Sequence, residues 1–412
     1  MANTGEVVRV SRLPSSIWVL GFVSMFMDIS SEMIHSLLPV FLVTTLGASA
    51  FTVGLIEGAA ESVALMVKVF SGALSDHLGR RKGLAVVGYG LGALSKPLFA
   101  IATSAGMVFG ARFVDRIGKG IRGAPRDALV ADLVPPEVRG SAYGLRQALD
   151  TVGAFTGPLL AVGLMLLWAN DFRAVFAVAI VPGVLAVLLL VVGVREPPRP
   201  AARMRSERPR SPVRWRQLRR LGSAYWWVVG IGAVVTLARF SEAFLVLRAE
   251  DGGLALAWIP LVLVAMNLVY AAAAWPFGWL SDRISHVRLL LLGLVVLVGA
   301  DLVLAMAPSW PLMLVGVGLW GLHMGITQGL LATMVAAVAP ADLRGTAFGF
   351  FNLLSGATML VASGLAGLVW DLVSPAATFL VGAGFCVLAI GAIGVHGRRP
   401  QGAQGDRRPR DA

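Results

Sequence analysis

Charged residues are scarce in this chain, and their scarcity decides its broad class. Asp, Glu, Lys and Arg make up only 14% of the 412 residues, whereas hydrophobic residues make up 57%. A soluble domain carries about 25% charged residues. The composition therefore excludes a soluble globular protein and indicates an integral membrane protein.

Residues and motifs that carry enzyme chemistry are equally sparse. The single cysteine, Cys386, excludes an internal disulfide and leaves thiol redox chemistry without support. The five histidines are scattered, and no His, Cys and carboxylate cluster has metal-ligand spacing. Neither a GxxxxGK[ST] phosphate loop nor a nucleophile elbow occurs. We therefore expect no bound metal, no cofactor and no enzymatic activity.

Long apolar runs dominate what remains. Runs of about 20 residues, bounded by charge, Gly or Pro, are long enough to cross a bilayer as helices. The sequence thus predicts an all-α integral membrane fold with twelve transmembrane helices, near 16–45, 51–75, 83–103, 106–131, 140–168, 172–194, 223–248, 254–280, 287–306, 310–339, 344–370 and 375–395.

The two halves of the chain repeat each other. GALSDHLGRRKGL at 72–84 recurs as GWLSDRISHVRLL at 278–290, and EVRGSAYGL at 137–145 recurs as DLRGTAFGF at 342–350. Parallel repeats about an axis along the membrane normal place a substrate site between the halves. We expect two pseudo-symmetric six-helix bundles at 1–194 and 223–395, a cytoplasmic linker at 195–222 and a disordered cytoplasmic tail at 396–412.

Positive charges gather on alternate connections. Of the 35 Lys and Arg residues, 24 lie in the amino terminus, the linker, the tail and every second connection, and nine lie in the spans. By the positive-inside rule, both termini and the linker are cytoplasmic, in a cell (inner) membrane. The net charge of +12 is then a topology signal, and we expect no nucleic-acid partner. The linker, with ten Arg and five Pro, has a composition that cannot bury a core.

The predicted fourth span carries an unusual load of charge. Seven charged residues lie between Arg112 and Asp127. At about 2.5–3.5 kcal/mol each, seven charges facing lipid would cost roughly 20 kcal/mol. Asp115, Lys119, Arg122 and Arg126 recur at helical spacing on one stripe. That stripe must face other helices or water.

Two of these motifs resemble the major facilitator superfamily, and the resemblance covers essentially the whole chain. The loop GALSDHLGRRK at 72–82 is similar to the cytoplasmic signature of that family, and its second copy keeps Gly278, Asp282 and Arg283. RIGKG at 116–120 resembles the family's buried-arginine motif, with Lys119 where a polar residue is usual. The longer string DRIGKGIRGAPRDALVAD also looks like an uncharacterised prokaryotic subgroup of these transporters.

A third motif bears on the direction of transport. GAFTGP at 153–158 is similar to the glycine-proline motif of drug:proton antiporters, although Ala161 and Val162 stand where two glycines are expected. The resemblance favours export over import. Close helix packing by small residues explains the same motif equally well and implies no direction.

The resemblance also implies that spans one, four, seven and ten line a central cavity. Candidates for proton coupling on these spans are Asp28, Glu32, Asp115 and His323. The protonation of a carboxyl group in such a cavity depends on its hydration and on nearby cations, which is what coupling to a proton requires. The alternatives are static ion pairs of the acids with Arg112 or Arg116 and a structural role for the histidine. Pro39 predicts a kink in the first span.

Two further sets of residues are expected to contact substrate or to form a gate. The candidates for substrate contact are Arg112, Arg116, Lys119, Arg122, Arg239, Glu242 and Gln328. Guanidinium and ammonium groups among them can hold an anionic group. The candidates for a cytoplasmic gate are Asp76, Arg80, Arg81, Arg126, Asp127, Arg139, Arg146, Asp150, Asp282 and Arg283.

Some of the charged residues are expected to pair. Arg146 with Asp150, and Arg239 with Glu242, lie four and three residues apart. Lys68 and Lys96 are expected to join helices. Asp301 is expected to reach the membrane interface.

The function favoured by these features is proton-coupled secondary transport of a small organic solute by alternating access, as efflux by an antiporter. The first alternative is an organic or inorganic anion carrier working by symport or uniport. The second is a non-transporting membrane scaffold or receptor, which would not need eighteen ionisable residues in its spans. The expected partners are a small-molecule solute, which is an anion under the first alternative, together with protons and the lipid bilayer. We expect a monomer.

Overall fold

The structure, a computed structural model, describes residues 13–78, 81–196, 215–340 and 343–397, and these residues form helices and no strand. Eleven helical segments in these ranges are long and apolar enough to cross a membrane. The twelfth is α5 (Ala105–Leu133), which has the same 29-residue length as α3, α6 and α16 but many more charges. The predicted twelve-helix, all-α membrane fold is confirmed.

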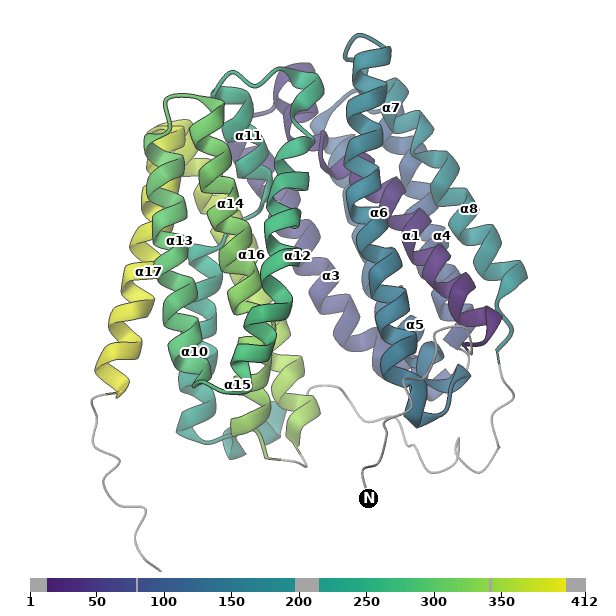
Figure 1. Ribbon diagram of the computed structural model, residues 1–412, viewed down its shortest axis with the longest axis vertical. Helices are drawn as coiled ribbons and strands as arrows, with labels where there is room; N and C mark the ends of the chain where they lie inside the picture. The colour runs from purple at the N-terminus through teal and green to yellow at the C-terminus, as the bar shows by residue number, and fades with distance from the viewer. Residues whose placement is uncertain (1–12, 79–80, 197–214, 341–342, 398–412) are drawn as a thin grey trace, which may run out of the picture.

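The first half of the chain forms one bundle. Its helices are α1 (Ser15–His35), α2 (Leu38–Val40), α3 (Ala50–Leu78), α4 (Arg81–Ala100), α5, α6 (Arg139–Leu167), α7 (Phe172–Val178) and α8 (Ile180–Gly193). The second half forms a bundle beside it (Figure 1). Its helices are α10 (Ser223–Ala238), α11 (Ala243–Asp251), α12 (Leu261–Ser281), α13 (His286–Met306), α14 (Trp310–Thr327), α15 (Leu330–Val338), α16 (Arg344–Leu372) and α17 (Pro375–Gly397).

Four of the described spans are interrupted, and the break in the sixth is limited to Ala179 between α7 and α8. The first changes course between α1 and α2, just before Pro39, and continues as a π-helical turn at Phe41–Thr45. Proline lacks a backbone N–H and crowds the preceding turn, so the predicted kink is confirmed. The seventh span breaks between Ala238 and Ala243 without a proline. The tenth breaks at Gly329, which has a φ of 72° that favours glycine.

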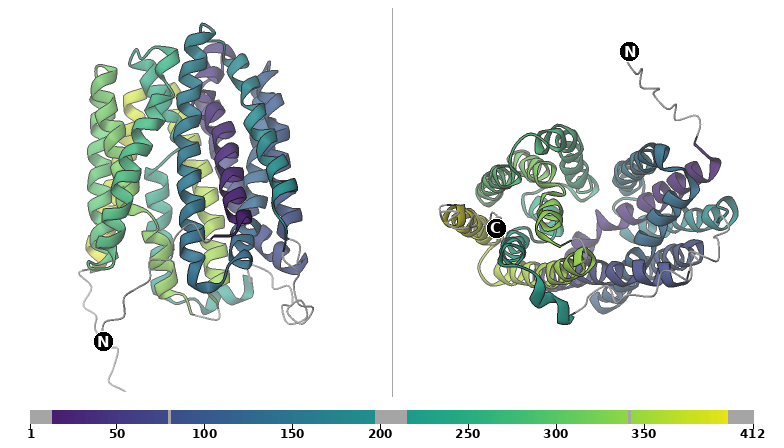
Figure 2. Two further views of the ribbon diagram at one scale, coloured as in Figure 1. Left: turned by 45° about the vertical axis from the view of Figure 1, so that its right-hand side comes forward. Right: turned by 90° about the horizontal axis from the view of Figure 1, so that it is seen from below.

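The two bundles meet along α3 and α16, which pack side by side (Figure 2). Glycines allow this close approach. A Cβ at Gly54 would lie 2.1 Å from the Ser363 carbonyl oxygen, and one at Gly367 would lie 2.4 Å from that of Ala50. At one end, the Asp371 carboxylate of α16 accepts hydrogen bonds from the backbone N–H groups of Ala50 and Phe51, at 3.0 and 2.8 Å. This end, where α3 begins, is the closed end.

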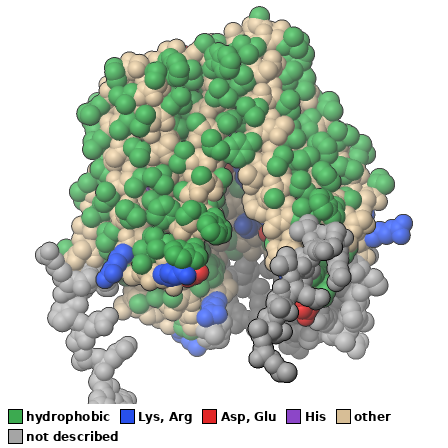
Figure 3. All heavy atoms as spheres, viewed as in Figure 1, with side chains coloured by type: hydrophobic (Ala, Val, Ile, Leu, Met, Phe, Trp, Pro, Cys, Tyr) green, Lys and Arg blue, Asp and Glu red, His purple; other side chains and the backbone are tan. Residues whose placement is uncertain are grey.

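The opposite end, where α1 begins and α17 ends, is open. The surface is hollowed between the bundles there, and charged side chains appear along its rim (Figure 3). Hydrophobic side chains cover most of the remaining face in this view, as expected of a surface in contact with lipid.

The connection between the bundles is described only in part, because 197–214 of the predicted linker and 398–412 of the predicted tail lie outside the described residues. Trp215–Arg220 forms a short 3-10 helix beside α16. Leu218 and Leu221 are buried in the core of the second bundle. This end of the predicted linker therefore packs against the second bundle.

Candidate functional site

Two adjoining cavities lie on the path from the middle of the molecule to the open end. The interface cavity, of about 290 Å³, lies between the bundles and is lined by Glu32, His35, Glu57, Glu61, Arg116, Lys119 and Ala154 of the first and Arg239, Phe240, Ser241, Glu242, Leu263, Asn267 and Met359 of the second. The amino-terminal cavity, also of about 290 Å³, is lined by residues of α1, α3, α5 and α6 alone. The cavities share Glu32, Glu61 and Lys119.

Interrupted helices supply the wall of the interface cavity. His35 is the last residue of α1, and Arg239 to Glu242 fill the gap between α10 and α11. Backbone that leaves a helix inside a membrane needs other partners. Here the Ser241 N–H donates to the Ser363 hydroxyl at 3.2 Å, which ties the break to α16. Residues at the break thus face the cavity instead of continuing a helix.

A chain of charged groups leads from the wall of the interface cavity into the first bundle. The Nδ1 atom of His35 lies 3.3 Å from a Glu32 carboxylate oxygen, and its Nε2 atom lies 3.7 Å from Glu57. Arg112 donates to the same Glu57 oxygen at 2.7 Å, with both side chains almost wholly buried. Arg112, predicted to contact substrate, lines neither cavity.

Asp115 is the second node of this chain. Its carboxylate accepts a hydrogen bond from Lys96 of α4 at 2.8 Å and lies 3.9 and 3.8 Å from Arg112 and Arg116. Lys96 also donates to the Ser31 hydroxyl of α1 at 3.0 Å. The geometry is that of a static ion pair, with Lys96 as its closest partner instead of Arg112 or Arg116. Asp115 lines neither cavity.

The charged residues of α5 are sheltered from lipid as the sequence requires. Asp115, Arg116 and Arg122 are buried. Arg116 lies 3.2 Å from Glu61 of α3. The Arg122 guanidinium lies 4.9 Å from the ring centroid of Tyr89 in α4, a cation–π contact. Partners on α3 and α4 thus take up much of the charge that would otherwise face acyl chains.

Three charged groups of the interface cavity have no ion pair within the described part of the chain: Lys119 of the first bundle, and Arg239 and Glu242 of the second. The expected pair of Arg239 with Glu242 does not form there. Lys119 is exposed to the cavity space, and the other two are half-buried. The cavity therefore presents unpaired charges of both signs, from both bundles, to a ligand.

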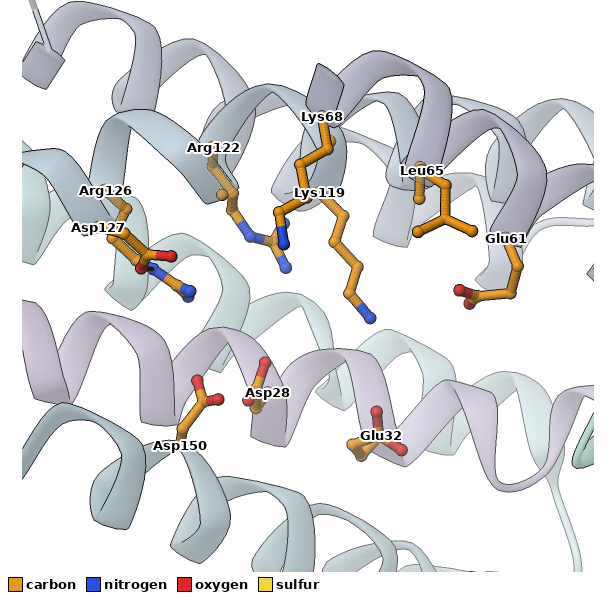
Figure 4. A pocket seen from close by; sticks show the side chains of 13 residues that line it. Asp28, Glu32, Glu61, Leu65, Lys68, Lys119, Arg122, Arg126, Asp127 and Asp150 are labelled. Carbon is orange, nitrogen blue, oxygen red and sulfur yellow. Dashed lines mark hydrogen bonds and ion pairs between the residues drawn. The ribbon is translucent and has the colours of Figure 1, made fainter. Parts of the chain in front are cut away.

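The amino-terminal cavity has two chemically different walls (Figure 4). The cationic wall, formed by Lys68 of α3 and Lys119 and Arg122 of α5, lies on one side, which also carries the ion-paired Glu61, Arg126 and Asp127. Asp28 and Glu32 of α1 and Asp150 of α6 lie on the other.

The comparisons with known proteins agree with this arrangement, in which two bundles enclose a polar cavity that faces only the open end. A family model described as Major Facilitator Superfamily matches residues 20–259 and 243–411. The chain belongs to this superfamily. It is a multi-pass membrane transporter and not an enzyme. An uncharacterized MFS-type transporter of Methanocaldococcus jannaschii is 32% identical over 388 residues, or 92% of this chain and 93% of that protein.

Other similarities within the superfamily are more partial. The multidrug resistance protein MdtH of Cronobacter sakazakii is 32% identical over 160 residues, only 39% of this chain and 37% of that protein. A solved bacterial homolog of the human lysosomal transporter Spinster has a TM-score of 0.73 at 16% identity, over 93% of this chain and 96% of that one. A peptide transporter POT in complex with sulfate has a TM-score of 0.74 at 15% identity, over 94% and 97%. These two structures share the fold.

Other predicted site residues of this superfamily member lie away from both cavities. His323 is fully buried, with its Nδ1 atom 2.8 Å from the Gly293 carbonyl oxygen. Gln328 is exposed at the break between α14 and α15. Asp301 does not reach the membrane interface as expected, because it is 0% exposed inside the second bundle.

Each of the following contacts of the predicted gate residues joins groups of the same bundle. Arg81 pairs with Asp132 at 2.7 Å, and Arg126 with Asp127 at 3.1 Å. Further contacts include Arg146 with Asp150 at 3.7 Å and with Asp127 at 4.0 Å, Arg139 to the Ala131 carbonyl at 3.3 Å, and Arg283 over the Trp279 ring at 3.3 Å. The expected pair of Arg146 with Asp150 is confirmed. Asp282 is exposed. Arg80 and the side chain of Asp76 lie outside the described residues.

Sequence reasoning gave no role in this site to His35, Glu57 or Glu61, and it expected Lys68 to join helices, whereas Lys68 lines the amino-terminal cavity. His35 and Lys68 line the cavities, Glu57 lines the interface cavity and holds Arg112, and Glu61 holds Arg116. A signal was present, since Glu57, Glu61 and Lys68 recur at helical spacing on one face of a membrane span. Charges inside a span need partners, so this face should have been paired with the charged face of the fourth span.

Proposed function

We propose that this transporter moves a small organic solute by alternating access and couples that movement to protons. The observation that carries the proposal is the interface cavity, which is lined by unpaired charges from both bundles and lies between a closed and an open end. Rocking of one bundle against the other about such a site would expose it to each side in turn. The groups we propose for proton coupling are Glu32 and Glu242 on its wall and Asp28 in the adjoining amino-terminal cavity.

There are two candidate modes of transport, and different features of the protein support each. Similarity to proteins named multidrug resistance protein MdtH and the glycine-proline motif at 153–158 support export by proton antiport. The unpaired cations Lys119 and Arg239 support an organic-anion carrier. We further propose a monomer, because a single chain lines the whole cavity, and cytoplasmic termini in an inner membrane, because the positive-inside rule places them there.

Purified protein in proteoliposomes with an entrapped pH-sensitive dye tests this proposal. Solutes from a library of metabolites, antibiotics and organic anions are added outside, with and without an imposed proton gradient. We expect one or more solutes to move protons, inward for symport and outward for antiport. The matched control is Asp171→Asn, because Asp171 caps α7 away from the cavity; Glu242→Gln should lose the response that this control keeps. Solute flux at the same rate with and without the imposed proton gradient would contradict the proposed coupling.

A further inference from the structure

The cationic wall of the amino-terminal cavity is unusual because its three side chains are free of carboxylate partners. Lys68 and Lys119 are exposed to the cavity, and neither pairs with an acid among the residues that the structure describes. Arg122 is only 5% exposed, and its Nη1 atom has no hydrogen-bond partner there. A buried guanidinium without an acceptor is costly, so this wall is suited to an incoming acceptor.

The acidic wall stands opposite. Asp28 and Asp150 lie next to each other on this wall (Figure 4). Asp150 also lies 3.7 Å from Arg146, whereas Asp28 has no ion pair within the described ranges. Asp28 is therefore the acid whose charge depends on its surroundings.

We propose that Lys68, Lys119 and Arg122 bind the carboxylate or phosphate group of an organic anion, and that Asp28 takes up a proton as the anion binds. This inference rests on the proposed function and names its substrate class. A multiply charged oxyanion suits this wall because a guanidinium binds it with paired hydrogen bonds and an ammonium binds it as a point charge. The proton passes from water at the open end to a carboxylate oxygen of Asp28, and no other bond changes.

Competition for the same cations links the two events. The charged groups that line the cavity with Asp28 are Glu32 on its own helix, Asp150 on α6, Lys68 and Glu61 on α3, and Lys119, Arg122, Arg126 and Asp127 on α5. While Asp28 is ionised, its charge attracts the cations that the anion needs. A proton removes that charge, so proton and anion favour each other's binding by the same factor. They would then cross together, as symport.

The purified full-length chain in nanodiscs allows a direct test by isothermal titration calorimetry. The probes are succinate for a carboxylate, inorganic phosphate for a phosphate, and tetraethylammonium as a cation control, each between pH 5.5 and 8. We expect succinate or phosphate to bind more tightly as pH falls, by at most about tenfold per pH unit for one coupled proton. Titration in two buffers of different ionisation enthalpy should show net proton uptake.

Substitutions assign these effects to the two walls. Lys119→Gln should weaken anion binding about tenfold, the usual loss of one charge-assisted contact, and Lys119→Arg should restore most of it. Lys82→Gln is the matched control, because the Lys82 ammonium bonds the Val191 carbonyl outside the cavity. Asp28→Asn should leave anion binding intact, remove its pH dependence and abolish proton uptake.

Three results would each overturn the inference: equal anion affinity in Lys119→Gln and Lys82→Gln, tighter binding as pH rises, or unchanged proton uptake in Asp28→Asn. If the protein shows proton-coupled flux in proteoliposomes but none of these anion-binding effects, the anion site alone would be refuted. Anion binding with proton uptake but without flux would refute transport and keep the site.

Discussion

Several buried charged residues of this protein are held in place by ion pairs with residues of opposite charge. Lys96 and Asp115 are 1% and 3% exposed, and Arg112 with Glu57 is equally enclosed. Such pairs contribute little net stability when intact, yet breaking one leaves a buried charge without its partner. Lys96, Asp115 and Arg112 therefore support the cavities without facing them, whereas Glu57 also lines the interface cavity.

Asp115→Asn should destabilise the protein by about 3–5 kcal/mol, because it leaves the buried Lys96 ammonium without its carboxylate. Lys96→Met should cost less, since Asp115 keeps Arg112 and Arg116 within 4 Å. The double substitution should recover part of the loss of Asp115→Asn. Thermal unfolding of the purified variants in detergent measures all three, and a double variant whose loss equals the sum of the two single losses would contradict the pairing.

Residue-level contacts were predictable only where both partners lie on one helix. The pair of Arg146 with Asp150 follows from a spacing of four residues. The contacts of Lys96 with Asp115 and of His35 with Glu57 join different helices. Their spacing in sequence carries no information on which helices are neighbours or how each is rotated. His35 was missed for this reason, because its importance comes from acids on two helices.

At the scale of helices, the sequence predicted where the membrane spans lie, but it predicted only some of the breaks within them. Each predicted span corresponds to a helical segment, since length and hydrophobicity are properties of the chain itself. The kink before Pro39 was predictable from the chemistry of proline. The break at Arg239 to Glu242 was not, because it contains neither proline nor glycine and depends on the contact with Ser363 of α16.

The cap that Asp371 places on α3 is the element-scale contact most open to test. A carboxylate at a helix amino terminus contributes about 0.5–2 kcal/mol, and this one joins the two bundles. Asp371→Asn should therefore favour opening of the closed end. The reporter is Ser241→Cys, in the interface cavity, combined with Cys386→Ala to remove the only native thiol. A membrane-impermeant maleimide added on the closed side should react about fivefold faster after a loss of about 1 kcal/mol.

The matched control is Asp171→Asn, which makes the same substitution at the cap of α7 within one bundle. Its labelling rate should equal that of the parent protein. A similar increase in both variants would mean that the effect comes from general loosening and not from the contact between bundles.

For the whole molecule, the arrangement implies that binding and translocation are separable. The cavities face the open end, whereas exchange of sides requires the closed end to part. Cysteines placed at Ala50 and Asp371, in a Cys386→Ala background, should form a cross-link that stops solute turnover. Binding from the open side should persist.

Reduction of the cross-link should restore turnover, measured as solute flux in proteoliposomes. Each single-cysteine variant serves as its control and should be insensitive to oxidation. Turnover that continues with the cross-link intact would mean that the bundles do not rock apart at this end.

The charged residues of α5 also bear on how the chain enters the bilayer during synthesis. A segment with this composition gains little by partitioning alone from the translocation channel into lipid. Its partners Glu57 and Glu61 on α3 and Lys96 on α4 precede it in the chain and are inserted first. The partners of these α5 residues are therefore already in the membrane when α5 is synthesised. We expect α5 to leave the channel while packed against α3 and α4.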